Sequence, residues 1–190
     1  MGILTVPKDA RTNNGSIVAL AAEPDRREAT SDAMRFAPQR VHQRCVLEMV
    51  KLLDEFVESS HVGVAFTAPA SGGSEDTITP DVAVVAHQAG VVSPFWRPSD
   101  RLLLAVEVVS PATARDDRLR KRVAYTGMGS IYWIVDLDAQ LVERWLPCAR
   151  RPDIIDDELF WFPEGASEPL LIDVERYFAS VFRCFDRGAR

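Results

Sequence analysis

The sequence is poor in cysteine, has no long apolar run and carries no excess of positive charge. Its three cysteines, Cys45, Cys148 and Cys184, are odd in number and lie far apart, without the spacing of a zinc site. This pattern argues against a disulfide framework and favours a reducing cytoplasm. No apolar run approaches the roughly 18 residues of a membrane helix, and the N-terminal residues show no convincing signal-peptide cleavage site. We therefore expect a soluble cytoplasmic protein that does not bind a membrane.

The overall charge and the length set further limits on the kind of protein. A net charge of −6 argues against a protein that wraps nucleic acid along a broadly cationic surface. A local basic groove stays open, because affinity depends on where the charges lie. The length of 190 residues fits one domain, or one domain with a tail. A chain of this size buries roughly 70% of its unfolded surface, so it can fold without a disulfide or a metal.

The N-terminal residues differ in composition from the rest of the chain. Residues 1–37 are polar and irregular except for the apolar stretch 17–22, and we interpret them as an N-terminal extension with one short strand. Residues 38–190 form the predicted folded domain. This domain should begin with an amphipathic helix at about 39–59, because the apolar residues there fall on one continuous arc at about 100° per residue.

The rest of the predicted domain combines strands with two more helices. A charged helix at about 114–126 ends at Gly127 and Gly129, and a last helix is expected at about 174–182. The expected strands lie at about 62–68, 78–86, 102–109, 131–135, 141–146 and 158–162. The order is helix, three strands, helix, strand, and then additions. Because a helix joins the third strand to the fourth, these two should pair in parallel within an α/β fold whose sheet is covered on both faces.

Two acidic side chains interrupt strands that are otherwise apolar. Glu107 is the only charge in the strand 102–109, and Asp81 interrupts the apolar end of the strand 78–86. A buried carboxylate costs several kcal/mol unless it is compensated. By strand alternation the two carboxylates can point the same way from adjacent strands, which would make a site of oxygen ligands for a hard cation. The spacing alone leaves a second interpretation open, namely a buried ion pair with an arginine and no metal.

The acids belong to a series of short motifs that runs through the first two thirds of the predicted domain. The motifs are Arg40-Val41-His42-Gln43-Arg44, Thr79-Pro80-Asp81, Glu107-Val108-Val109-Ser110-Pro111, Asp117, Lys121, Tyr125 and Tyr132-Trp133-Ile134-Val135-Asp136. This series resembles the Uma-two family, bacterial proteins described as restriction endonucleases of the PD-(D/E)XK nuclease superfamily. The resemblance covers about residues 38–136. It implies an α/β fold with a PD-(D/E)XK restriction-endonuclease-like core, an αβββαβ mixed sheet, to which C-terminal strands and a helix are added.

The same resemblance implies a hydrolase that cleaves phosphodiesters with Mg²⁺ or Mn²⁺. Asp81 and Glu107 would be the metal ligands and would act in catalysis together with Lys121. In the superfamily the lysine normally lies two residues after the glutamate, where this chain has Val109. The lysine of the family is displaced to the next helix, and Lys121 matches that position. A Glu-Leu-x-x-Gly stretch that usually precedes the family's first helix is not evident in this sequence.

Several further side chains are predicted to support the site. Asp117, Lys121 and Tyr125 stand at i, i+4 and i+8 and therefore line one side of the helix 114–126. In the functional interpretation Lys121 reaches the carboxylates and the scissile phosphate. In the alternative, Asp117 and Lys121 form a surface pair worth about 0.2–0.5 kcal/mol, and Tyr125 belongs to the core. His42 is likewise either a supporting residue of the site or a buried neutral histidine.

The helix 114–126 also carries a basic cluster. The cluster consists of Arg115, Arg118, Arg120, Lys121 and Arg122. Of these, Arg115, Arg118 and Arg122 are candidate nucleic-acid contacts that could bind phosphates beside the site, although a solvated helix face balanced by acids is the alternative. Residues 38–190 are thus interpreted as an endonuclease-like domain that acts on DNA, or on RNA, as a homodimer whose two-fold symmetry suits cutting both strands. Two other functions stay open: a nuclease fold that binds nucleic acid or protein without catalysis, and a structural domain whose acids pair with arginines.

Overall fold

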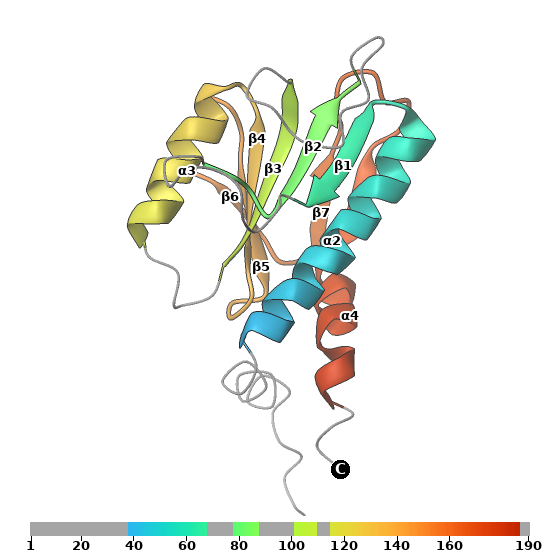
Figure 1. Cartoon of the computed structure of the whole chain (residues 1–190), viewed down its shortest axis with the longest axis vertical. Helices are drawn as coiled ribbons and strands as arrows, with labels where there is room; N and C mark the ends of the chain where they lie inside the picture. The colour runs from blue at the N-terminus through green and yellow to red at the C-terminus, as the bar shows by residue number, and fades with distance from the viewer. Residues whose placement is uncertain (1–37, 68–77, 88–100, 110–114, 187–190) are drawn as a thin grey trace, which may run out of the picture.

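The computed structural model describes residues 38–67, 78–87, 101–109 and 115–186 (Figure 1). Its helices are α2 (Pro38–Ser60), α3 (Arg115–Gly127) and α4 (Val174–Asp186). Its strands are β1 (Gly63–Thr67), β2 (Val82–Ala86), β3 (Leu102–Val109), β4 (Ile131–Asp136), β5 (Leu141–Trp145), β6 (Asp153–Ile155), β7 (Glu158–Trp161) and β8 (Leu170–Asp173). Among these helices none is long and apolar enough to cross a bilayer.

The main sheet has six strands that follow one another in chain order, β1-β2-β3-β4-β5-β6. Neighbouring strands are antiparallel except for β3 and β4, which pair in parallel from Leu104↔Ile131 to Val109↔Asp136. A parallel pair needs a crossover connection, and α3 supplies it. Strands β7 and β8 form a separate two-stranded sheet. The predicted parallel pair and the predicted order of helix, three strands, helix and strand are both confirmed.

Two helical layers cover the two faces of the main sheet (Figure 1). On one face, α2 and α4 pack over the side chains of Val82, Val106 and Trp133. On the other face, α3 places Tyr125 among alternate residues of the same strands, such as Ala83 and Ala105. Because side chains alternate along a strand, a single apolar run such as β3 can fill both cores. The PD-(D/E)XK-type α/β fold expected from the resemblance is therefore present.

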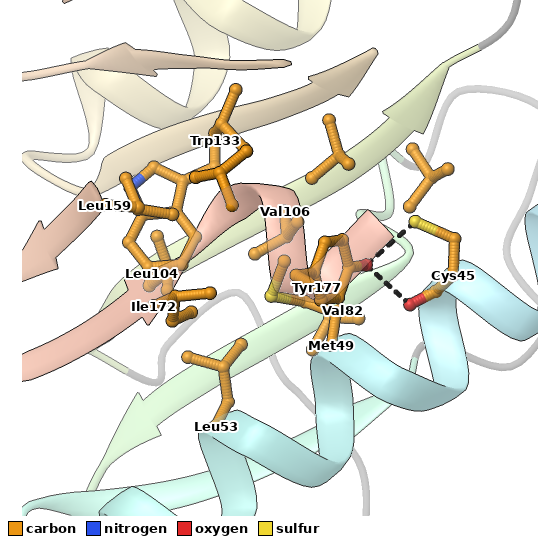
Figure 2. Packing of buried hydrophobic residues seen from close by; sticks show 14 of the residues in the cluster. Cys45, Met49, Leu53, Val82, Leu104, Val106, Trp133, Leu159, Ile172 and Tyr177 are labelled. Carbon is orange, nitrogen blue, oxygen red and sulfur yellow. Dashed lines mark hydrogen bonds between the residues drawn. The ribbon is translucent and has the colours of Figure 1, made fainter. Parts of the chain in front are cut away.

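Helix α2 carries the apolar stripe that its sequence predicts. Its fully buried residues recur every four positions: Val41, Cys45, Met49, Leu53 and Val57. Figure 2 shows this stripe facing the sheet, with Tyr177 of α4 close to Cys45. The Tyr177 hydroxyl donates to the Cys45 carbonyl at 2.9 Å and lies 2.8 Å from the Cys45 sulfur. Burial raises the pKa of the Cys45 thiol to about 12, so this cysteine acts as a structural group.

Some of the predicted elements differ from those in the structure. The strand predicted at 78–86 is wrong at its start, since β2 begins at Val82. Pro80 has no N–H to donate to a ladder, which accounts for the later start and leaves Asp81 just outside the strand. The short strands β6 and β8 were not predicted. The apolar stretch 17–22, for which a strand is expected, lies outside the described residues.

Candidate active site

Glu107 lies in the middle strand of the sheet and faces α3. Its side chain is 14% exposed, and its Oε1 atom accepts a hydrogen bond from Lys121 Nζ at 2.5 Å. Lys121 comes from the crossover helix and is itself 15% exposed. The helix therefore delivers an ammonium group to a carboxylate that would otherwise be costly to bury.

Asp81 lies beside Glu107 at the start of the neighbouring strand. Val82 pairs with Val106, so extending the antiparallel register by one residue places Asp81 opposite Glu107. Because Asp81 precedes the strand, its carboxylate can turn toward the β3 backbone, where Oδ2 accepts the Val108 N–H at 2.8 Å. Its side chain is 25% exposed. The two carboxylates thus occupy one end of the β2–β3 pair, and Asp81 is the more open of the two.

His42 reaches Asp81 from the opposite helical layer. It belongs to the second turn of α2, and its Nε2 atom lies 3.3 Å from Asp81 Oδ2. The hydrogen bond to Asp81 is the main reason why the pKa of His42 is raised, and burial opposes this shift. The charges of Asp81 and Glu107 and a backbone hydrogen bond to Val108 raise the pKa further. His42 is therefore electrostatically coupled to both carboxylates.

The predicted supporting residues of α3 have different surroundings. Tyr125 is fully buried, and its ring packs on Tyr132 of β4 with centroids 5.3 Å apart. The backbone positions of Arg115, Asp117 and Arg118 lie in α3, but their side chains lie outside the described residues.

The third candidate nucleic-acid contact, Arg122, makes a contact that the sequence pattern did not predict. Its guanidinium carbon lies 4.4 Å from the centroid of the Trp145 ring, and Trp145 Nε1 donates to Glu143 Oε2 at 3.2 Å. Strand alternation places Glu143 and Trp145 on one face of the predicted strand 141–146, but no sequence pattern places Arg122 over that face.

The oxygen donors of this site have the chemistry of ligands for a hard divalent cation. Among the described residues no group of three or more histidine, cysteine or acidic side chains is arranged to enclose a metal. Mg²⁺ is commonly held by one or two carboxylates and completes its shell with water and substrate phosphate. Two carboxylates on paired strands, Asp81 and Glu107, match that requirement better than they match a closed all-protein site.

Comparison with known proteins adds to this geometry. A family model named Uma2, described as "Putative restriction endonuclease", matches residues 31–155, which is more than half of the chain. The chain belongs to this family. The match begins before α2 and extends through β6. His42, Asp81, Glu107 and Lys121 therefore all lie inside it. Membership of the Uma2 family supports a nuclease function.

A solved structure shows the same fold. It is a crystal structure titled as that of "a putative nuclease belonging to DUF820" from Anabaena variabilis. The two chains are 19% identical, the alignment covers 74% of this chain and 82% of that one, and the TM-score is 0.59. At this identity the likeness establishes the fold of this Uma2 protein and no more. No curated protein matches the chain.

Proposed function

We propose that this Uma2 protein is a metal-dependent phosphodiester hydrolase, an endonuclease that acts on DNA. The observation that carries the proposal is the hydrogen bond of Lys121 to Glu107 next to Asp81. An acid, a second acid and a lysine from three different segments meet at the end of one strand pair. This combination would be costly to maintain as packing alone, because the charged groups are largely buried.

The two carboxylates are the proposed ligands of Mg²⁺ or Mn²⁺. Asp81 and Glu107 supply oxygen atoms, which are the donors that hard cations prefer. The bound ion would lower the pKa of a water molecule and neutralise negative charge on the phosphate. Asp81 is held for this role by the Val108 N–H and by His42, which fix the direction of its carboxylate. His42 is thus a supporting residue in the proposal.

Lys121 is the proposed catalytic cation of the protein itself. An ammonium group has donors only, so Lys121 cannot be a metal ligand. From its place on Glu107 it can orient a water molecule or donate to a phosphate oxygen as charge develops there. Tyr125 supports it through the packing of α3 on β4, and Asp117, one turn earlier in the helix, is proposed to help to orient it.

The proposed substrate is held by phosphate contacts. Arg115 and Arg118 precede Lys121 on α3 and could bind the phosphates on either side of the scissile one. A two-fold dimer completes the proposal, because two copies would present one site to each strand of a duplex. The free thiols Cys45 and Cys148 support a cytoplasmic location for the protein.

The proposal is tested by separating metal binding from cleavage. Lys121→Met should retain Mn²⁺ binding in calorimetry, whereas metal-dependent cleavage of duplex DNA should fall at least roughly a hundredfold, as when one group that stabilises the transition state is lost. Glu107→Gln should weaken both. Lys51→Met is the matched control, because Lys51 is 67% exposed on α2 and its loss removes the same charge.

Two results would overturn parts of the proposal. If Lys121→Met cleaves as fast as the wild type, the assignment of the lysine is wrong even though the protein is an enzyme. If the wild type cleaves neither DNA nor RNA of many sequences with either metal, a nuclease fold that only binds nucleic acid or protein becomes the better interpretation.

A further inference from the structure

Three described side chains of helix α3, those of Tyr125, Lys121 and Arg122, contact the sheet. In the middle, Tyr125 packs on Tyr132 of β4. Lys121 reaches to β3 on one side of that strand, where it bonds Glu107. On the other side Arg122 reaches to β5, where it covers the Trp145 ring. The two cationic side chains are neighbours in sequence and diverge because successive helical residues are turned by about 100°.

We infer that Arg122 is a positioning residue, which sets the rotation of α3 and thereby holds Lys121 on Glu107. This inference rests on the proposed role of Lys121 in cleavage. It assigns Arg122 a different role from the phosphate contact that its place in a basic cluster suggests. The chemical device is a cation–π contact between the guanidinium group and the indole face.

The Arg122 contact is built into the sheet. Trp145 is 8% exposed and pairs with Tyr132 in the β4–β5 register, so the indole lies directly beside the ring on which Tyr125 packs. Its N–H donates to Glu143 Oε2, which fixes the orientation of the ring. Arg122 is a half-buried residue, and its guanidinium carbon lies 4.4 Å from the centroid of this oriented ring.

The Lys121 contact lies one row further along the same sheet. Glu107 pairs with Ile134, and Ile134 pairs with Glu143, so the three residues form one row across β3, β4 and β5. The two helix contacts therefore lie on either side of β4. A rotation of α3 about its axis in either direction would pull one of them apart. Side-chain atoms lie about 5–6 Å from a helix axis, so a rotation of about 10° moves them by about 1 Å. A misplacement of that size can cost about a hundredfold in rate.

The kinetic test compares Arg122→Met with Arg122→Lys and with the control Arg183→Met, which removes an exposed arginine of α4 on the opposite face. Arg122→Met should lower kcat by about tenfold to a hundredfold and leave KM nearly unchanged. Arg122→Lys keeps a cation over the ring and should recover part of the loss. Trp145→Phe keeps an aromatic face but lacks the N–H that bonds Glu143, so its kcat should fall between those of the wild type and Arg122→Met. Arg183→Met should have no effect.

Two measurements distinguish positioning from phosphate binding. If Arg122 acts through Lys121, Arg122→Met should cause no further loss of rate in the Lys121→Met background. In Arg122→Met, the slope of the logarithm of the DNA-binding constant against the logarithm of the salt concentration should equal that of the wild type. If Arg122 contacts a phosphate, Arg122→Met should instead make that slope less steep by about one and weaken DNA binding both with and without Lys121→Met. This result would overturn the inference.

A third measurement does not require activity. Reductive methylation followed by mass spectrometry reports how accessible Lys121 is, with the exposed Lys51 as the internal reference. In Arg122→Met, but not in Arg183→Met, the methylation of Lys121 relative to Lys51 should become severalfold faster. Faster methylation in a protein that never cleaves nucleic acid would support the positioning of Lys121 and reject the proposed function. Unchanged methylation would overturn the inference even if the protein is a nuclease.

Discussion

Replacing Lys121 by methionine in metal-free buffer should lower the free energy of unfolding by about 2–3 kcal/mol. The substitution keeps an unbranched side chain of similar length and removes the charge together with the N–H donors that bond Glu107. It leaves Glu107 with 14% of its side chain exposed and without the ammonium group that lies 2.5 Å from it. Removing one member of a fully buried ion pair costs about 3–5 kcal/mol, and an exposed pair is worth about 0–1 kcal/mol. Since both side chains are mostly but not fully covered, the expected loss falls between these limits.

The reverse substitution and the double variant complete the cycle. Glu107→Gln should cost a similar amount, because Lys121 then loses its carboxylate in the same covered place. The double variant Lys121→Met/Glu107→Gln should be no less stable than either single variant, since no charge is left behind. The two losses should therefore be strongly non-additive, with a coupling energy of about 2–3 kcal/mol.

Urea unfolding followed by tryptophan fluorescence gives the three free energies. The buried indoles of Trp133 and Trp161 report on the core that lies on the other face of the sheet from Lys121 and Glu107. Added EDTA keeps the carboxylates free of divalent ions. Single losses below about 0.5 kcal/mol, or losses that simply add in the double variant, would mean that Lys121 is not held by Glu107 and would refute the reasoning.

Two other expectations concern the residues on the α2 side of the sheet. The raised pKa of His42 means that its protonated form favours the folded state; this contribution is complete below the unfolded pKa of about 6.5 and is lost as pH rises through the folded pKa. His42→Gln should therefore destabilise the metal-free protein more at about pH 5.5 than at about pH 8.5, and an equal effect at both values would contradict the pairing with Asp81. Tyr177→Phe removes the hydroxyl that donates to the Cys45 carbonyl, and should cost about 1–2 kcal/mol in urea unfolding while cleavage stays at the wild-type rate. Lost cleavage in a folded Tyr177→Phe protein would show that α4 contributes to the site.

Long periodic segments could be predicted from the sequence because their pattern is local. The apolar stripe of α2 is determined by spacing within one segment, and β3 has the predicted bounds of 102–109 because it is apolar on both faces. The strands β6 and β8 have three and four residues, and each includes an aspartate. Such short strands form because β5 and β7 offer a partner, and that partner is brought in only by the tertiary fold.

In the candidate site, too, some features follow from the sequence and others depend on the tertiary fold. The charges of Asp81 and Glu107 stand out within their own strands, and the position of Lys121 follows from the family resemblance. The hydrogen bond from the Val108 N–H to Asp81 depends on where β2 begins, which strand periodicity alone placed four residues too early. The contact between Arg122 and Trp145 depends on how α3 lies over β4. Local pattern therefore identified the two acids and the resemblance identified Lys121, but neither could identify the neighbours that hold them.

The late start of β2 at Val82 also explains how two acids can be neighbours without a large cost. Glu107 lies inside a strand, so alternation turns it toward α3, where Lys121 neutralises it. Asp81 lies just outside a strand, so it can turn to the Val108 N–H and to His42 from α2. Each carboxylate is compensated by a side chain from a different helix, so the two compensating contacts form independently of each other. A lysine side chain has many rotamers and loses considerable entropy when it is held in one place, about 1.5–2 kcal/mol. A helix that is free to rotate could not offset this loss of side-chain entropy, because Lys121 would leave Glu107 too often. A rigidly oriented α3 is therefore needed most where Lys121 meets Glu107.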